Sequence, residues 1–287
     1  MLSPPITIFW PQRHDVFGVR VSATRYDEVI DRVLEAAEAG EPALIDFMPA
    51  HVLTVAARDP LYRRQLNCFD ILAPDGQPVR WALNYFHNAG LTDRVYGPEL
   101  MRRLCAAAAE QGVPIYLYGG TEEVVRRLSN RLLEWFPKLK IAGAESPPFR
   151  PLTPQEDAEA VRRINDSGAR LLFLGIGSPK QEVFAFAHRD KIRAVQLCVG
   201  AAFDFHAGVK KMAPAWMQRR GLEWLFRLTQ EPGRLWKRYL VANTTFLYLF
   251  AKAALRTAFK RERPGLDLIL GQAGRGAKRN PGYPPRQ

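Results

Sequence analysis

The sequence predicts an α/β fold: a Rossmann-like, mostly parallel sheet with helices on both faces, followed by a C-terminal helical appendage. The first observation is that short apolar runs alternate with helical patterns along most of the chain. Strands separated by helices of ten or more residues build right-handed βαβ units. The second observation is a basic, aromatic segment at the end of the chain. With 287 residues and 47% hydrophobic content, the chain can bury a large core.

The expected strands are the short apolar runs at 17–23, 43–48, 69–73, 114–120, 139–143, 170–177 and 194–205. The expected helices lie at 26–37, 98–111, 122–136, 154–165 and 179–189. Sheets of this kind bind ligands beyond the carboxyl ends of their strands. Four loops are therefore expected to share one rim: 74–76, 119–120, 175–179 and 200–204.

Charge divides the chain unevenly. Residues 1–209 carry 24 basic and 25 acidic side chains, whereas residues 210–287 carry 17 basic and 4 acidic ones, a net charge of +13. We interpret 1–209 as one Rossmann-like domain and 210–263 as a basic, aromatic helical appendage. Residues 264–287 are rich in Gly, Pro and Arg, which predicts a disordered basic tail.

The appendage is expected to contain consecutive helices over 214–259. Its most apolar part, 240–255, is shorter than the roughly 20 residues that span a bilayer, and it contains polar side chains. Aromatic rings interleaved with Arg and Lys suit helices that lie in the headgroup zone of an anionic membrane. The alternative is that these rings fill a core and the cations form a solvated face.

Cysteines and the N-terminus indicate a reducing compartment. Cys68, Cys105 and Cys198 are isolated in apolar sequence, so neither a disulfide framework nor a CxxC site is expected. The first residues do not form a secretory signal. We expect no metal and no cofactor, because the chain has no Asp-x-Asp, HExxH or Cys cluster.

The segment 175–182, GIGSPKQE, follows an apolar strand and opens a helix. Gly175 and Gly177 would let backbone approach a ligand closely, and the helix amides with Lys180 and Gln181 could hold a diphosphate. A simple tight turn between strand and helix is the alternative.

Asp75, in LAPDGQPV, is the candidate general base, because a carboxylate at a strand exit can accept the proton of a sugar hydroxyl. The alternative is an Asp-Gly turn residue that bonds its own backbone. Asp46 ends an apolar strand and must find a partner or solvent. Arg94 could reach a phosphate or form a surface salt bridge. His51 and His206 are interpreted as structural.

Several motifs occur in a characteristic order: LAPDGQPV, DRVYGPEL, IYLYGG, LFLGIGSPKQE, VGAAFDFHAG and MAPAWMQRRGLEWLFRLTQEPGRLWKRYL. Together they resemble the WecG/TagA/CpsF family of bacterial glycosyltransferases over about residues 16–245. The resemblance implies an inverting, metal-independent hexosyltransferase. It would move a sugar from a UDP-sugar to a polyprenyl-diphosphate-linked sugar in surface polysaccharide, exopolysaccharide or teichoic-acid-type synthesis, on the inner face of the cytoplasmic membrane.

The resemblance assigns Asp75 as the catalytic base and Arg94 and Gln181 to substrate binding. The full set of expected donor- or substrate-binding residues is Asp46, Arg94, Gly119, Gly175, Gly177, Lys180, Gln181, Glu182 and Asp204. The appendage residues expected to reach the diphosphate or the membrane are Arg219, Arg220, Arg227, Arg234 and Arg238.

The chain departs from the family at two places. It has Asp46-Phe47-Met48 where members typically carry Thr-x-Asn, and Tyr96-Gly97-Pro98-Glu99 where Thr-Gly-Thr-Asp is common. The donor sugar is therefore not assigned, and a homo-oligomer stays open. Two alternative functions are a basic nucleic-acid-binding protein and a nucleotide-dependent oxidoreductase. Bulky aromatics in the appendage argue against nucleic acid as a partner, and an incomplete glycine fingerprint argues against the second.

Overall fold

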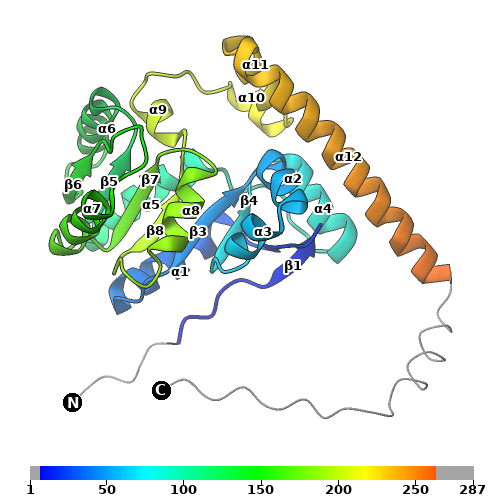
Figure 1. The fold of residues 1–287 in the computed structure, drawn as a ribbon, viewed down its shortest axis with the longest axis horizontal. Helices are drawn as coiled ribbons and strands as arrows, with labels where there is room; N and C mark the ends of the chain where they lie inside the picture. The colour runs from blue at the N-terminus through cyan, green and yellow to red at the C-terminus, as the bar shows by residue number, and fades with distance from the viewer. Residues whose placement is uncertain (1–6, 263–287) are drawn as a thin grey trace. The chain divides into compact units, whose positions relative to one another are not determined.

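The computed structural model describes residues 7–262 and contains a six-stranded parallel sheet with helices on both faces (Figure 1). The strand order is β4-β3-β8-β7-β5-β6. The strands are β3 (Leu44–Met48), β4 (Ile71–Pro74), β5 (Ile115–Gly119), β6 (Ile141–Glu145), β7 (Leu171–Gly175) and β8 (Val195–Cys198). The predicted fold class is confirmed.

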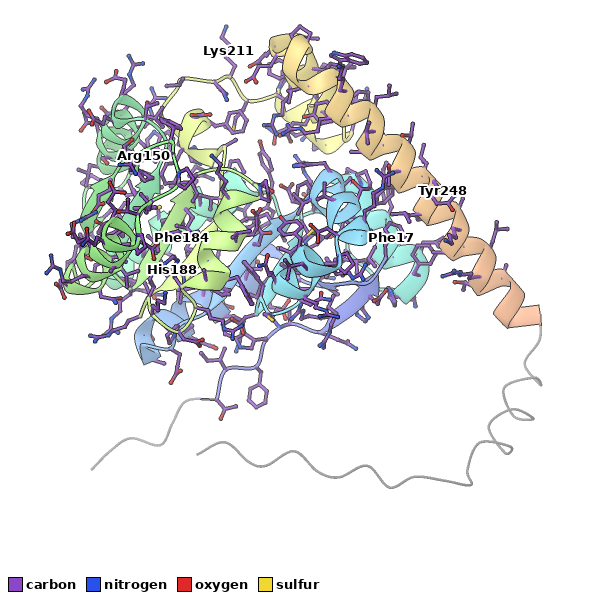
Figure 2. All side chains as sticks on the ribbon, viewed as in Figure 1. Phe17, Arg150, Phe184, His188, Lys211 and Tyr248 are labelled. Carbon is purple, nitrogen blue, oxygen red and sulfur yellow. The ribbon has the colours of Figure 1, made fainter. Side chains whose placement is uncertain are left out.

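The N-terminal segment differs from the prediction of one strand over 17–23. It forms an antiparallel hairpin of β1 (Arg13–Val16) and β2 (Val19–Ser22). The chain turns at Phe17 and Gly18, which have φ of 58° and 89°. The Phe17 ring, which Figure 2 labels, packs edge-on against Phe246, and the ring centroids are 5.4 Å apart.

One face of the sheet carries the large apolar core. It is covered by α1 (Tyr26–Ala39), α5 (Gly97–Gln111), α6 (Glu122–Trp135) and α9 (Ala202–His206). Alternate strand residues such as Ile45, Phe47 and Phe173 point into it and are at most 5% exposed. This alternation is what the strand period of two dictates.

The opposite face is covered by α3 (Pro60–Leu66) and α8 (Lys180–Ala187). The other helices of the sheet-containing part are α2 (Ala50–Arg58), α4 (Gln77–His87) and α7 (Pro154–Asp166). The expected helices correspond to α1, α5, α6, α7 and α8, whereas α2, α3 and α4 were not predicted. The expected strand over 194–205 is wrong at its end, because β8 stops at Cys198 and α9 begins at Ala202. A capping box of Thr153 and Glu156 begins α7, and Asp59 caps α3.

The C-terminal part is helical as predicted, with α10 (Ala215–Arg219), α11 (Glu223–Gln230) and α12 (Pro232–Glu262). The chain divides into two compact units, residues 1–246 and 247–287. No helix within residues 7–262 is long and apolar enough to cross a membrane. The division at 209 and 263 stays a prediction, and the expected disordered tail of 264–287 lies outside the described residues.

The carboxyl ends of the parallel strands meet at one edge, so the four predicted loops do share a rim. Backbone bonds join these ends: the Asp75 amide donates to the Met48 carbonyl at 3.2 Å, and the Gly120 amide donates to Gly175 at 3.2 Å. The Gly200 amide donates to the Leu174 carbonyl at 3.0 Å. The rim is therefore held by the same ladder that builds the sheet.

Candidate active site

Asp75 is the first residue after β4 and stands on the rim. Its amide is bound by the end of β3, and the Pro74 carbonyl accepts a bond from the Val95 amide at 2.9 Å. Gly76, with φ of 95°, then turns the chain into α4. In the described part of the chain, the Asp75 carboxylate makes no hydrogen bond to the backbone of this turn. The rim therefore presents the carboxylate to the cationic side chain of Arg94.

Arg94 lies between two carboxylates. Its Nη1 is 3.6 Å from Asp75 Oδ1, and its Nη2 is 2.5 Å from Glu223 Oε2 on α11. The Arg94 and Glu223 side chains are each 9% exposed, and that of Asp75 is 18% exposed. The guanidinium also lies over the Tyr96 ring, 4.4 Å from its centroid. Of the two sequence alternatives for Arg94, the structure shows an ion pair that is buried rather than superficial.

This environment makes Asp75 a candidate base. Burial raises its pKa to about 7, against the opposing effect of Arg94. Glu223 raises the pKa further and Arg227 lowers it. A carboxylate that titrates near neutral pH can accept a proton and release it again. The geometry therefore gives Asp75 the basicity that its predicted role requires.

Arg227 on α11 is the predicted appendage cation that reaches this group. Its guanidinium lies 5.6 Å from the centroid of the Phe205 ring, and its charge acts on both Asp75 and His51. Burial, Arg238 and Arg227 together lower the pKa of His51 to about 3. His51 is therefore neutral, in keeping with its interpretation as structural.

Three of the other predicted appendage cations are exposed: Arg219, Arg220 and Arg238. Arg220 lies over the Trp216 ring at 6.0 Å. Arg238, on α12, lies 5.6 Å from the Tyr239 ring centroid. Arg234 belongs to α12, and its side chain lies outside what the structure describes. A role of these residues at the diphosphate or the membrane stays a prediction.

The predicted ligand-contacting glycines have packing reasons of their own. A Cβ on Gly119 would lie 2.4 Å from the Gly175 backbone, and one on Gly175 would lie 2.6 Å from the Phe203 ring. Gly177 has open space around it and φ of 82°. Gly119 and Gly175 thus let β5, β7 and α9 approach one another, whereas Gly177 serves the turn.

The first turn of α8 points its polar residues in different directions. Lys180 is exposed, whereas Gln181 is 5% exposed and its Nε2 donates to the Cys198 carbonyl at 3.1 Å. A Cβ on Gly200 would lie 3.2 Å from Gln181 Oε1, so this amide lies against the rim loop that follows β8. Glu182 is only 1% exposed and is turned into the protein.

Asp46 and Glu182 form a buried carboxyl pair beneath the rim. Asp46, in the middle of β3, is 1% exposed. Both of its carboxyl oxygens and Glu182 Oε2 lack a hydrogen-bond partner among the described residues. Burial and the charge of Glu182 raise the pKa of Asp46 well above its usual value, and burial raises the pKa of Glu182 to about 7. In this conformation the pair is enclosed rather than open to a substrate.

Asp204 has an ionic partner within the fold. Lys210 Nζ lies 2.8 Å from Asp204 Oδ2 and 3.3 Å from Glu231 Oε1. The cation therefore links Asp204 of α9 to Glu231 at the end of α11. His206 is buried, with Nε2 2.8 Å from the Pro98 carbonyl, which agrees with its structural interpretation.

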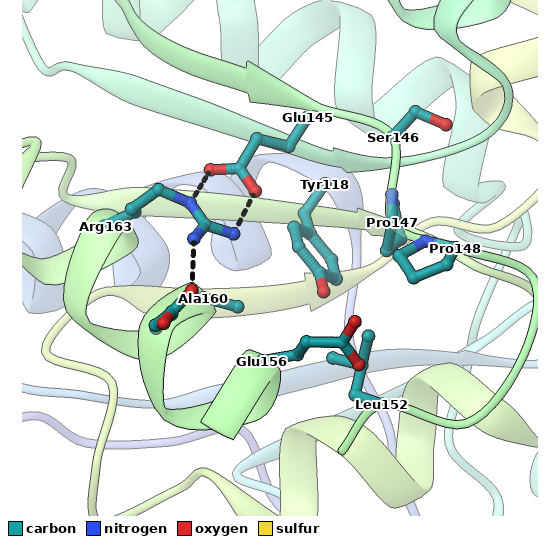
Figure 3. Close-up of a pocket in the computed structure, with 10 residues that line it drawn as sticks. Tyr118, Glu145, Ser146, Pro147, Pro148, Leu152, Glu156, Ala160 and Arg163 are labelled. Atoms are coloured by element: carbon teal, nitrogen blue, oxygen red, sulfur yellow. Dashed lines mark hydrogen bonds and ion pairs between the residues drawn. The ribbon is translucent and has the colours of Figure 1, made fainter. Parts of the chain in front are cut away.

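A small hollow of about 190 Å³ lies elsewhere, beside β5 and β6 (Figure 3). Its charged groups are already paired: Arg163 Nε and Nη2 donate to the two oxygens of Glu145 at 2.9 and 3.0 Å. Tyr118 lines the hollow and stacks on Phe184 of α8 at 5.3 Å. Satisfied ion pairs leave this hollow less suited to chemistry than the Asp75 rim.

The structure brings three of the predicted site residues together: Asp75, Arg94 and Arg227. Sequence reasoning missed Glu223, although the segment GLEW had been noted. The available signal was an acid within a segment that carries 17 basic and 4 acidic side chains. It also missed the pairing of Lys210 with nearby Asp204 and with Glu231, which lies farther along the chain at the end of α11.

Within residues 7–262, no group of three or more His, Cys, Asp or Glu side chains could hold a metal ion. The family model described as "Glycosyl transferase WecG/TagA/CpsF family" matches residues 14–260. The match includes the sheet, its rim loops, α10 and α11. Family membership favours a transferase over the nucleic-acid-binding and oxidoreductase alternatives. The chain therefore belongs to the WecG/TagA/CpsF family of glycosyl transferases, which act in cell-envelope polysaccharide synthesis.

Proposed function

We propose that the protein transfers a hexose or N-acetylhexosamine-type sugar from a UDP-sugar to a polyprenyl-diphosphate-linked sugar, with inversion and without a metal ion. One observation carries the proposal. Asp75 stands on the ligand-binding edge of the sheet with a pKa of about 7, beside the cations Arg94 and Arg227. A base and cations in one place are what transfer from a sugar diphosphate requires.

The proposed reaction is a single displacement. The acceptor hydroxyl oxygen attacks the anomeric carbon of the donor from the side opposite to UDP, and its proton passes to Asp75. The bond between the anomeric carbon and the β-phosphate oxygen breaks, and UDP leaves with the additional negative charge. Arg94 and Arg227 offset this charge, which is greatest as the bond breaks.

The proposed acceptor is a membrane lipid, and the appendage offers a suitable surface. Trp216, Trp224 and Trp236 are 50%, 38% and 48% exposed. Lys237 lies over the Trp236 ring at 5.4 Å, so cations and rings alternate on these helices. Aromatic rings and cations together favour the headgroup zone of an anionic leaflet. We propose peripheral binding at the inner face of the cytoplasmic membrane, with no nucleic-acid partner.

Product analysis tests the reaction. The full chain is incubated with a panel of UDP-sugars and a short-chain polyprenyl-diphosphate sugar, with and without EDTA. The expected result is one product whose mass has increased by one sugar, with inverted anomeric configuration by NMR and an unchanged rate in EDTA. Absence of product with every donor would overturn the proposed reaction, and loss of activity in EDTA would overturn the metal-free mechanism.

A vesicle experiment tests the membrane proposal. Flotation is measured with vesicles of phosphatidylcholine alone and with vesicles that contain an anionic lipid. Binding only to the anionic vesicles, and less of it at high salt, is expected because the appendage is basic. Equal flotation with both compositions would contradict an electrostatic contribution.

A further inference from the structure

Glu223 is an acidic side chain of the appendage that is buried beside the proposed base. It is the first residue of α11, 129 positions after Arg94, and it is 7% exposed. Burying a carboxylate is costly unless a cation accompanies it. The cation here is Arg94, which the proposed mechanism already uses.

The distances within the group are unequal. Arg94 Nη2 is 2.5 Å from Glu223 Oε2, whereas Arg94 Nη1 is 3.6 Å from Asp75 Oδ1. The second distance exceeds that of a normal hydrogen bond, about 2.7–3.2 Å. A guanidinium and a single carboxylate would otherwise favour a bidentate pair with two parallel bonds. Glu223 therefore competes with Asp75 for the same guanidinium.

We infer that Glu223 is a positioning residue: it holds Arg94 so that the guanidinium does not close on Asp75, and it thereby leaves the Asp75 carboxylate free to accept a proton. The inference rests on the proposed function, in which Asp75 is the base. An Asp75 paired on both oxygens with Arg94 would be a weaker base with fewer free lone pairs.

The surroundings restrict Arg94 to this arrangement. The Tyr96 ring lies against the guanidinium, and the Tyr96 amide donates to the Tyr26 hydroxyl at 2.8 Å, which fixes this part of the chain. With one side of the guanidinium covered, the two carboxylates compete for its edge. The charge of Glu223 also favours the protonated form of Asp75.

Glu223 is not the sole attachment of the appendage, so its effect can be separated from docking. Gly221 packs against Gln77 on α4: a Cβ on Gly221 would lie 3.0 Å from the Gln77 side chain. Glu231 shares Lys210 with Asp204, just as Glu223 shares Arg94 with Asp75. Glu231 is thus a matched control, because it is an appendage acid that shares a cation with a carboxylate of the preceding part of the chain, away from Arg94.

The test is the pH dependence of kcat/KM for E223Q, E223D and E231Q. In E223Q the acidic limb of the pH profile of kcat/KM is expected to move to lower pH by about one unit, because Arg94 can then approach Asp75 and lower its pKa. The plateau rate should fall by about threefold as the base weakens. E223D keeps the charge and should move the limb less than E223Q, and E231Q should leave it at the wild-type position.

A second readout does not depend on turnover. Wild-type and E223Q protein with ¹³C-labelled Asp carboxyls is titrated by NMR, and D75N identifies the Asp75 signal. A lower pKa of Asp75 in E223Q is expected, and an unchanged one overturns the inference. The inference is also overturned if the acidic limb of the pH profile of E231Q shifts as far as that of E223Q. If wild-type protein makes no product, the proposed reaction fails, whereas the titration still decides the role of Glu223.

Discussion

Two pairs of buried carboxyl groups lie at and beneath the same rim, and only one of the two pairs has a cation beside it. Asp75 and Glu223 share Arg94, with distances of 3.6 and 2.5 Å. Asp46 and Glu182 meet no cation, and three of their oxygens have no hydrogen-bond partner among the described residues. Both pairs are buried, so the cation is the main difference between them.

The difference separates Asp75, the proposed base, from Asp46. A cation between two carboxylates offsets the desolvation of their charges, so Asp75 can exchange a proton near pH 7. Asp46 has no such cation, and burial together with the charge of Glu182 raises its pKa well above the usual value, so the protonated form of Asp46 is favoured. A protonated Asp46 carries a hydroxyl group, as does the Thr that family members typically have there. A protonated Asp46 can therefore donate a hydrogen bond, as the Thr can.

Replacing Asp75 by Asn should have the largest effect. D75N keeps the size of the side chain but cannot accept the proton, and loss of a general base costs about 10²- to 10⁴-fold in rate. The rate of sugar transfer measures it, with circular dichroism to verify folding. The matched control is D93N, an exposed neighbour of Arg94 that should retain activity. Wild-type turnover in D75N would remove Asp75 as the base.

Replacing Arg94 by Met removes the cation between Asp75 and Glu223 and should leave them without a cation between them, as Asp46 and Glu182 are. Removing one partner from a buried ion group leaves uncompensated charge and costs about 3–5 kcal/mol. The free energy of unfolding in urea at pH 8 measures the loss. R102M removes an exposed cation paired with Glu99 and should change stability by about 0.5 kcal/mol or less. Equal losses in the two variants would show that burial of the Arg94 group carries no energetic weight.

The fold was predictable because the apolar alternation is local. Apolar runs such as 114–120 and 170–177 predict strands, and a parallel topology then brings the carboxyl ends of these strands to one edge of the sheet. The hairpin was missed because three of the four residues of β1, RHDV, are polar, so no apolar run marks this strand. No helical pattern was assigned to the segments of α2 to α4.

The site was predictable only in part, because some of its contacts join distant segments. Strand-end reasoning finds Asp75, whereas Arg94 was singled out because it precedes a predicted helix and because the family resemblance implies a role in substrate binding. The contact of Arg94 with Glu223 spans 129 residues, and no local pattern encodes it. Asp46 was expected near substrate, but it alternates with Ile45 and Phe47, which face the apolar core. Alternation therefore turns Asp46 to the other face, beneath α8.

Replacing Asp46 by Asn should stabilise the protein at neutral and alkaline pH. The folded pKa values of Asp46 and Glu182 are raised, so the stability from their protonated forms is fully present below about pH 4. That stability is lost as the pH rises through the folded values, near 7 for Glu182. An amide can also donate to Glu182, so a gain of about 1–3 kcal/mol is expected above pH 7.

Urea unfolding of wild type and D46N at several pH values measures this gain. The difference between the two proteins should shrink as the pH falls toward 4, because both carboxyls are then protonated in wild type. D190N, at a side chain that is 85% exposed, should show no such trend. A D46N protein that is less stable than wild type at pH 8 would mean that the Asp46 charge has a partner after all.

Replacing Lys210 by Met should have the smallest effect on the free energy of unfolding. Comparison with R94M then shows how much the burial of such a group contributes. Lys210 lies between Asp204 and Glu231 as Arg94 lies between Asp75 and Glu223, but the three side chains are 30%, 26% and 29% exposed. Water screens such pairs, so K210M should lose about 1 kcal/mol or less in urea unfolding, and less still in 1 M NaCl. A loss as large as that of R94M would show that one cation shared by two carboxylates stabilises the appendage by its geometry, whether or not it is buried.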